Sequence, residues 1–118
     1  MAHMKVETAD TALAVGSGSL EVLATPRLIA LMENAAMNAV APMLPEGVTT
    51  VGLRMDMHHA RPSALGAEVT ATATLKEIDG KRFTFSVEAV MGDVLVGEAL
   101  HVRAAVDGAK FMDRLAGK

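Results

Sequence analysis

Residues 25–47 read TPRLIALMENAAMNAVAPMLPEG, and this stretch decides the fold. Thr25 is typical of a helix N-cap, and Pro26 suits the first helical position because its missing N–H has no intrahelical partner there. Pro42 and Gly47 end the pattern. Between these limits apolar residues recur at helical spacing: Leu28, Leu31, Met32, Ala35, Ala36, Ala39 and Met43. The sequence therefore predicts one long amphipathic helix.

Strand patterns lie on both sides of this helix. Residues 8–15 alternate weakly and predict a first strand, which Gly16 ends. After Val48 the alternation of apolar and polar residues predicts four more strands, joined in part by hairpin turns at Asp79-Gly80 and Gly92-Asp93. The last strand, 94–106, is apolar on both faces, which predicts a homodimer formed through the sheet. The order predicts an α+β fold, with the helix covering a curved antiparallel sheet of about five strands.

The composition excludes several classes of protein. The 118 residues suffice for one domain, and no apolar run approaches the roughly 20 residues that cross a bilayer. The chain has no cysteine, which excludes disulfides and thiolate chemistry and favours a cytoplasmic location. A net charge of −3 argues against nucleic-acid binding. The start Met1-Ala2-His3-Met4 is typical of a vector-derived addition, so the domain is expected to span 4–118.

Two polar residues fall on apolar faces. At about 100° per residue, Glu33 lies on the flank of the buried face of the helix. It is either an edge carboxylate that reaches water or a salt bridge, or a reactive group. His59 is in phase with Leu53, Met55 and Met57, so it is either a hydrogen-bonded core histidine or a catalytic base.

The helix must cross the sheet, so Glu33 and His59 are expected to meet at its edge. Thr25, about 12 Å from Glu33 along the helix axis, either caps the helix or lies beside free N–H groups that favour an oxyanion. A metal site is not expected, because the adjacent His58 and His59 point to opposite faces of a strand. The chain contains neither a phosphate-binding glycine loop nor a nucleophile-elbow pentapeptide.

The chain resembles the fluoroacetyl-coenzyme A thioesterase family of hot-dog proteins. The resemblance runs from about Leu23 to Phe111, and its most specific part is Ala24-Thr25 followed one helix later by Leu31-Met32-Glu33. The remaining matches follow in the same order: Ala41-Pro42, His59, Gly66, Val69, Arg103 and Lys110-Phe111.

The resemblance implies a hot-dog homodimer, or a tetramer built from it, with active sites at the subunit interface. It also implies that Thr25, Glu33 and His59 are catalytic, and that Gly52 and Arg103 contact substrate. Arg103 is otherwise expected to pair with an acidic neighbour. The implied reaction is hydrolysis of a short acyl-CoA thioester, which needs no cofactor because a thioester is already electrophilic.

One departure bears on the substrate. No Phe occurs between Gly16 and Ala24, where the fluoroacetyl enzyme has aromatic lid residues, so strict selection for a fluorinated acyl group is not expected. Two other functions remain open: a non-catalytic acyl-CoA binding module and an enoyl-CoA hydratase on the same fold. Asp56 alternates away from the face of His59, which counts against the Asp–His pair of a hydratase.

Overall fold

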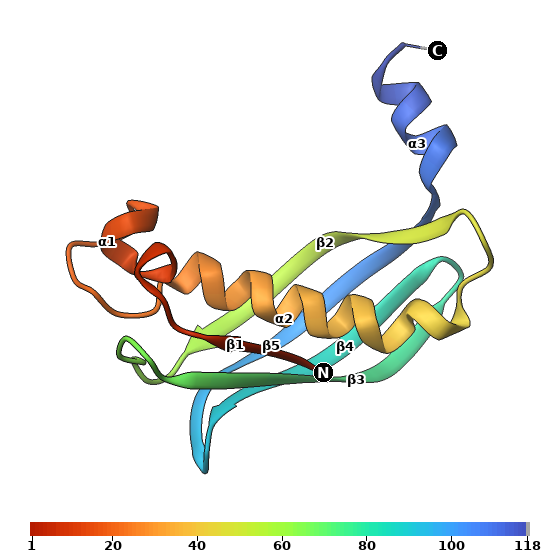
Figure 1. The fold of residues 1–118 in the computed structure, drawn as a ribbon. Coiled ribbons are helices and arrows are strands. Elements are labelled where there is room, and N and C mark those ends of the chain that lie inside the picture. Colours follow the sequence, from red (N-terminus) through yellow and green to blue (C-terminus); the bar gives the residue numbers. More distant parts are fainter. Residues whose placement is uncertain (118) are drawn as a thin grey trace.

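A single long helix lies across the concave face of a five-stranded antiparallel sheet (Figure 1). The computed structural model describes residues 1–117. The helix is α2, Thr25–Val40, and the sheet has the strand order β1-β3-β4-β5-β2. The strands are β1 Ala2–Lys5, β2 Val48–His59, β3 Glu68–Asp79, β4 Arg82–Met91 and β5 Val94–Asp107. The predicted α+β architecture, with one helix on a curved sheet, is confirmed.

Helix α2 supplies the centre of the core. Its buried side chains pack against inward residues of the sheet such as Phe85, Val87 and Val69. The helical residues buried there are Leu28, Leu31, Met32, Ala35, Ala36 and Val40. Two residues predicted on this face, Ala39 and Met43, are exposed, because the last turn of the helix buries only Val40. The 3-10 turn η2, Ala41–Met43, ends the helix at the predicted proline.

The predicted first strand at residues 8–15 is wrong. This segment forms a 3-10 turn, η1 Thr8–Asp10, and a short helix, α1 Ala12–Val15, which ends at Gly16 in the left-handed conformation with φ 88°. The Thr11 side chain caps α1 by accepting from the Ala14 N–H, and local capping prevails over weak alternation. The first strand is β1, which pairs with β3 and buries Ala2 opposite Ala71. A vector origin for residues 1–3 stays a prediction, although Ala2 and His3 belong to the sheet.

A β-bulge in strand β2 changes which side chains face the helix. Gly52 pairs with Arg103 and Arg54 with Val102, so Leu53 is an extra residue in the ladder. Met55, Met57 and His59 face α2 as predicted, but Leu53 is 50% exposed rather than part of this set. Because of the bulge, Gly52 also faces the helix.

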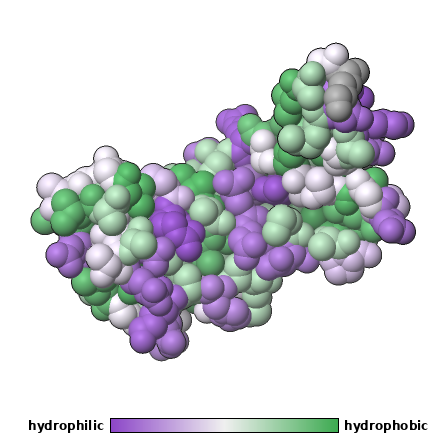
Figure 2. Space-filling model, turned by 45° about the horizontal axis from the view of Figure 1, so that its top comes forward, coloured by the Kyte–Doolittle hydropathy of each residue, from purple (hydrophilic) through white to green (hydrophobic). Residues whose placement is uncertain are grey.

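A C-terminal helix, α3 Gly108–Leu115, projects from the end of β5 away from the body of the molecule (Figure 1). The sequence patterns did not predict it, because they assigned 94–106 to a strand and nothing after it. Figure 2 shows apolar side chains on this helix and around α1; Met112 and Leu115 are exposed on α3, and Leu13 and Leu20 near α1. Within residues 1–117 none of the helices has the length and apolar character needed to cross a bilayer.

Candidate active site

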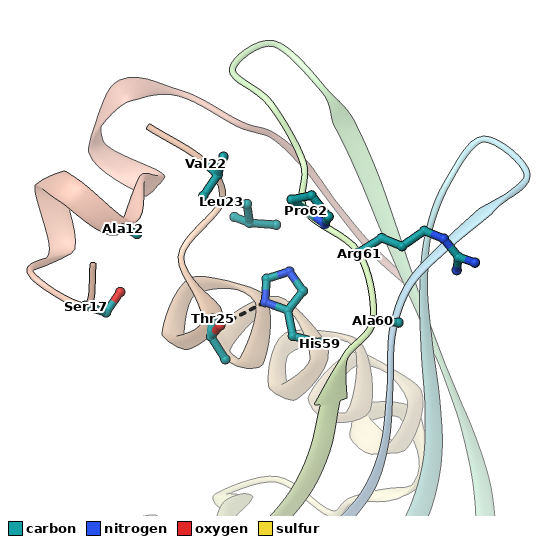
Figure 3. A pocket seen from close by; sticks show the side chains of 9 residues that line it. All are labelled: Ala12, Ser17, Val22, Leu23, Thr25, His59, Ala60, Arg61 and Pro62. Atoms are coloured by element: carbon teal, nitrogen blue, oxygen red, sulfur yellow. Dashed lines mark hydrogen bonds between the residues drawn. The ribbon is translucent and has the colours of Figure 1, made fainter. Parts of the chain in front are cut away.

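Thr25 and His59 form a hydrogen bond at one end of the sheet. Thr25 is the first residue of α2, and His59 is the last residue of β2. The Thr25 Oγ1 atom lies 2.8 Å from Nδ1 of His59 (Figure 3). The prediction that Thr25 caps the helix is wrong: the N-cap is Ala24, with Pro26 in the first turn, and no side chain caps the helix. The hydroxyl is therefore available to the imidazole.

The His59 ring borders a pocket of about 380 Å³. The wall opposite the ring comes from α1 and the loop after it, and Arg61 points away from the ring (Figure 3). The lining residues are Ala12, Ser17, Val22, Leu23, Thr25, His59, Ala60, Arg61 and Pro62. This pocket lies at the positive end of the α2 dipole, where a developing negative charge is stabilised.

The surroundings of the His59 imidazole favour its neutral form. Burial lowers the pKa of His59, the Arg61 backbone partly offsets this by favouring the charged ring, and the nearby His58 lowers the pKa further. The Nε2 atom is buried and, within residues 1–117, has no hydrogen-bond partner. A neutral ring with one nitrogen paired and the other free is the form that accepts or relays a proton.

Glu33 lies on α2 two turns after Thr25 and forms a separate group of contacts. Its Oε2 atom is 3.3 Å from Nη1 of Arg103, and its side chain is 42% exposed. The carboxylate rests against strand β2 at Gly52, where an added Cβ atom would lie only 2.7 Å from Oε2. Glu33 is thus a half-exposed carboxylate at the edge of the buried face, and it forms a salt bridge. This is one of the two roles that the helical pattern predicted for it.

Arg103 is almost fully buried, with 6% of its surface exposed. Its Nε donates to Thr50 Oγ1 at 2.8 Å and its Nη2 to the Thr50 carbonyl at 3.0 Å. Its Nη1 donates to Glu33 and to Nε2 of His101, at 3.3 and 3.2 Å. Of the two roles expected for Arg103, this geometry provides the pairing with an acidic neighbour, and direct contact with substrate stays a prediction.

Sequence reasoning missed Thr50 and His101, which complete the Arg103 network. A signal for His101 was present: it lies two residues before Arg103, so both side chains point to the same face of one strand. No comparable signal marked Thr50, because its contact with Arg103 depends on the pairing of β2 with β5.

The two groups do not meet within one protomer. Among residues 1–117, no hydrogen bond or ion pair joins Glu33 to His59. The Cα atoms of Thr25 and Glu33 are two helical turns apart on α2, about 12 Å along the axis. Because His59 is hydrogen-bonded to Thr25, it lies at the other end of this distance from Glu33. Nor does the described part of the chain contain a cluster of three or more metal-binding side chains.

Comparison with known proteins shows the family to which these residues belong. The family model described as fluoroacetyl-CoA-specific thioesterase, FlK, matches residues 6–109. The chain belongs to this family. A fluoroacetyl-CoA thioesterase from Streptantibioticus cattleyicolor is 35% identical over 91 residues, which span 77% of this chain and 66% of that protein. The chain therefore matches slightly less than two thirds of that relative.

Solved structures confirm the hot-dog fold of this FlK-family chain. A crystal structure of a variant of the fluoroacetyl-CoA-specific thioesterase FlK, in complex with fluoroacetate and CoA, superposes with a TM-score of 0.91 at 28% identity. The superposition covers 98% of this chain and 94% of that one. A hot-dog-like protein from Thermanaerovibrio acidaminovorans gives a TM-score of 0.86 at 28% identity, over 98% of this chain and 85% of its own.

Proposed function

We propose that this FlK-family chain hydrolyses acyl-CoA thioesters to a free acid and CoA. Family membership supports the reaction class. The observation that carries the proposal is the hydrogen bond between Thr25 and His59 at the wall of a pocket, beside the N-terminus of α2. Attack on a thioester carbonyl needs a proton carrier and a group that stabilises an oxyanion, and this place in the fold offers both. The proposal invokes no metal or redox cofactor.

The proposed roles follow from the environment of each side chain. In the tautomer in which Nδ1–H of His59 donates to the Thr25 hydroxyl, Nε2 is the nitrogen that accepts a proton from water and returns it to the departing thiolate. Such proton transfer contributes about 10²–10⁴-fold. The Thr25 hydroxyl, the Gly52 N–H and the end of the helix dipole stabilise the oxyanion, where one good donor is worth about 3–4 kcal/mol.

Glu33 is proposed as the group that starts the reaction. Either its carboxylate attacks the carbonyl carbon and expels the thiolate, leaving an anhydride that water hydrolyses, or it activates the attacking water directly. Both routes consume one water and release one acid and one thiol. Arg103 fixes the carboxylate from one side, and this leaves its partly exposed face free to react.

Glu33 and His59 are proposed to meet across a dimer interface. Within residues 1–117 strand β2 pairs only with β5, so its other edge is open over twelve residues. A long unpaired edge is a template for another strand. Two β2 edges that pair antiparallel around a two-fold axis would continue the sheet and keep both α2 helices on one side.

The bulge gives this pairing a register. Because Leu53 is extra, Gly52 and His59 lie three ladder positions on either side of Asp56. Pairing centred on Asp56 therefore sets Gly52 opposite the partner subunit's His59. The Glu33 carboxylate lies against Gly52, so it comes near that histidine as well. Opposed Cα atoms in such a ladder are about 4.5–5.5 Å apart, within side-chain reach. One protomer would supply Glu33, and the other would supply Thr25 and His59.

The decisive experiment is a panel of acyl-CoA thioesters assayed for release of free thiol. The parent protein is expected to release thiol from short acyl-CoA substrates, and Glu33→Gln and His59→Ala to lose most of this turnover. His58→Ala is the matched control, because His58 is exposed on the opposite face of β2. Saturable acyl-CoA binding without thiol release would instead indicate a binding module. Loss of enoyl absorbance without thiol release would indicate a hydratase. A cytoplasmic location stays a prediction.

A further inference from the structure

His101 is a buried histidine in the middle of strand β5, and the proposed reaction does not use it. Only 1% of its surface is exposed. Its Nδ1 lies 2.7 Å from the carbonyl oxygen of Arg54, and its Nε2 lies 3.2 Å from Nη1 of Arg103. It therefore connects two features of the site: the residue that follows the β2 bulge, and the arginine that holds Glu33.

These two partners determine the tautomer of the ring. A carbonyl oxygen only accepts, so Nδ1 must carry the proton that it donates to Arg54. A guanidinium only donates, so Nε2 must be the unprotonated acceptor for Arg103. Burial and the positive charge of Arg103 both lower the pKa of His101, while the Arg54 carbonyl and Glu33 oppose them. The ring is thus a neutral histidine with a fixed orientation.

Arg103 depends on this acceptor. Its five N–H groups meet four acceptors: Thr50 Oγ1, the Thr50 carbonyl, His101 Nε2 and Glu33 Oε2. The same nitrogen, Nη1, donates to both His101 and Glu33. If the His101 acceptor is lost, one buried N–H of Arg103 is unpaired, and only the two bonds to Thr50 keep the planar guanidinium from tilting away from the carboxylate.

We propose that His101 is a positioning residue: its Nε2 holds Nη1 of Arg103 in the orientation that fixes the Glu33 carboxylate against Gly52. This inference rests on the proposed function, in which Glu33 is the reacting carboxylate. Among residues 1–117, no hydrogen bond joins His101 to Glu33, and His101 does not line the pocket beside His59, so its hydrogen bonds reach Glu33 through Arg103.

Two substitutions separate the two hydrogen bonds of the ring. His101→Asn places an amide donor near the position of Nδ1 and removes the acceptor for Arg103. His101→Gln places an amide oxygen near the position of Nε2 and keeps that acceptor. Asn is one methylene smaller than Gln, so His101→Asn is expected to lower the melting temperature somewhat more, and the comparison therefore rests on kcat measured on the folded proteins. The expected result is kcat at least tenfold lower in His101→Asn than in His101→Gln, with KM changed less than threefold in either.

A double variant tests whether the effect passes through Arg103. In an Arg103→Met background, His101→Asn is expected to change kcat by less than about twofold, because the interaction it disrupts is already absent. Equal kcat in the Asn and Gln variants, or a further tenfold loss in the Arg103→Met background, would overturn the inference.

Nitrogen NMR of the unliganded protein gives a readout that does not depend on activity. The expected spectrum shows His101 as the Nδ1–H tautomer in the parent, with the Arg103 Nη1 protons protected from exchange in the parent and in His101→Gln, and exchanging faster in His101→Asn. A parent ring protonated at Nε2 would contradict the inference. If the parent hydrolyses no acyl-CoA, the proposed function fails, and these spectra still decide whether His101 positions Arg103.

Discussion

The Glu33 carboxylate lies directly on Gly52, so close that a Cβ atom at position 52 would be 2.7 Å from Oε2. Glycine at this place in β2 is explained by the helix above it, since a side chain there would occupy the space of the carboxylate. Arg103 holds the same carboxylate from the neighbouring strand β5, which pairs with Gly52 in the ladder. The position of Glu33 is thus set jointly by α2, β2 and β5.

Gly52→Ala is expected to lower turnover without unfolding the protein. The added methyl group meets the end of a flexible, partly exposed side chain, so Glu33 moves and the strand stays in place. Misplacement of a reacting group by about 1 Å costs on the order of 10²-fold in rate. Thiol release and the melting temperature should be measured together. A melting temperature close to that of the parent, with kcat unchanged, would contradict the role given to this contact.

The fold was predictable because its main patterns are local. Proline and glycine mark the ends of α2. Asp79-Gly80 predicts a hairpin because glycine readily adopts the positive φ that such a turn needs, and Gly80 has a φ of 60°. The error at residues 8–15 arose where alternation was weak and side-chain capping by Thr11 decided the local structure. Helix α3 was missed although Asp107-Gly108 breaks the strand pattern, and the Asp107 side chain caps the helix by accepting from the Lys110 N–H.

The site was predictable only in part, because its contacts join residues far apart in the chain. Glu33 and His59 were identified as polar groups on or beside apolar faces and Thr25 as the start of the helix, and the structure pairs Thr25 with His59. The pairing of Glu33 with Arg103 spans 70 positions and depends on strand order. The bulge that turns Gly52 towards the helix reverses the alternation on which the sequence argument relied.

Mixing two inactive variants is expected to restore activity. In a composite site, a heterodimer of Glu33→Gln and His59→Ala contains one intact pair, Glu33 from one chain and His59 from the other. Random exchange of subunits in a two-fold dimer should restore about a quarter of the parent turnover. The measurement is thiol release before and after exchange under mild denaturant, with each variant exchanged against itself as the control. If the active site lay within a single chain, the mixture would stay inactive.

Acid is expected to destabilise the fold because two histidines, His59 and His101, are withdrawn from water in the folded state. Burial lowers the pKa of His59 and His101 in the folded state below the value of 6.5 that they have when unfolded. The unfolded chain therefore binds more protons as the pH falls through 6.5, and the free energy of unfolding decreases, by at most about 1.4 kcal/mol per pH unit for each group. Their contribution to stability is fully present above pH 6.5. Urea unfolding between pH 5 and 8 measures this slope, and His101→Gln should reduce it. An unchanged slope in that variant would show that His101 does not contribute.

The chain is expected to discriminate weakly between fluoroacetyl-CoA and acetyl-CoA. On the α1 side, the wall of the pocket beside His59 consists of small or aliphatic residues such as Ala12, Ser17 and Val22. The two larger side chains in the loop from 18 to 22, Leu20 and Glu21, are exposed. Among residues 1–117, no Phe side chain lines this pocket. Because one methylene-sized difference in an apolar pocket is worth about 1–3 kcal/mol even when the fit is close, an open wall should give less. The ratio of kcat/KM for the two substrates is therefore expected to be below about tenfold, in line with the lower end of that range. Ser17→Phe should raise this ratio by narrowing the pocket, whereas the control Ser17→Ala should not. A parent ratio of a thousandfold would show that selectivity has another source.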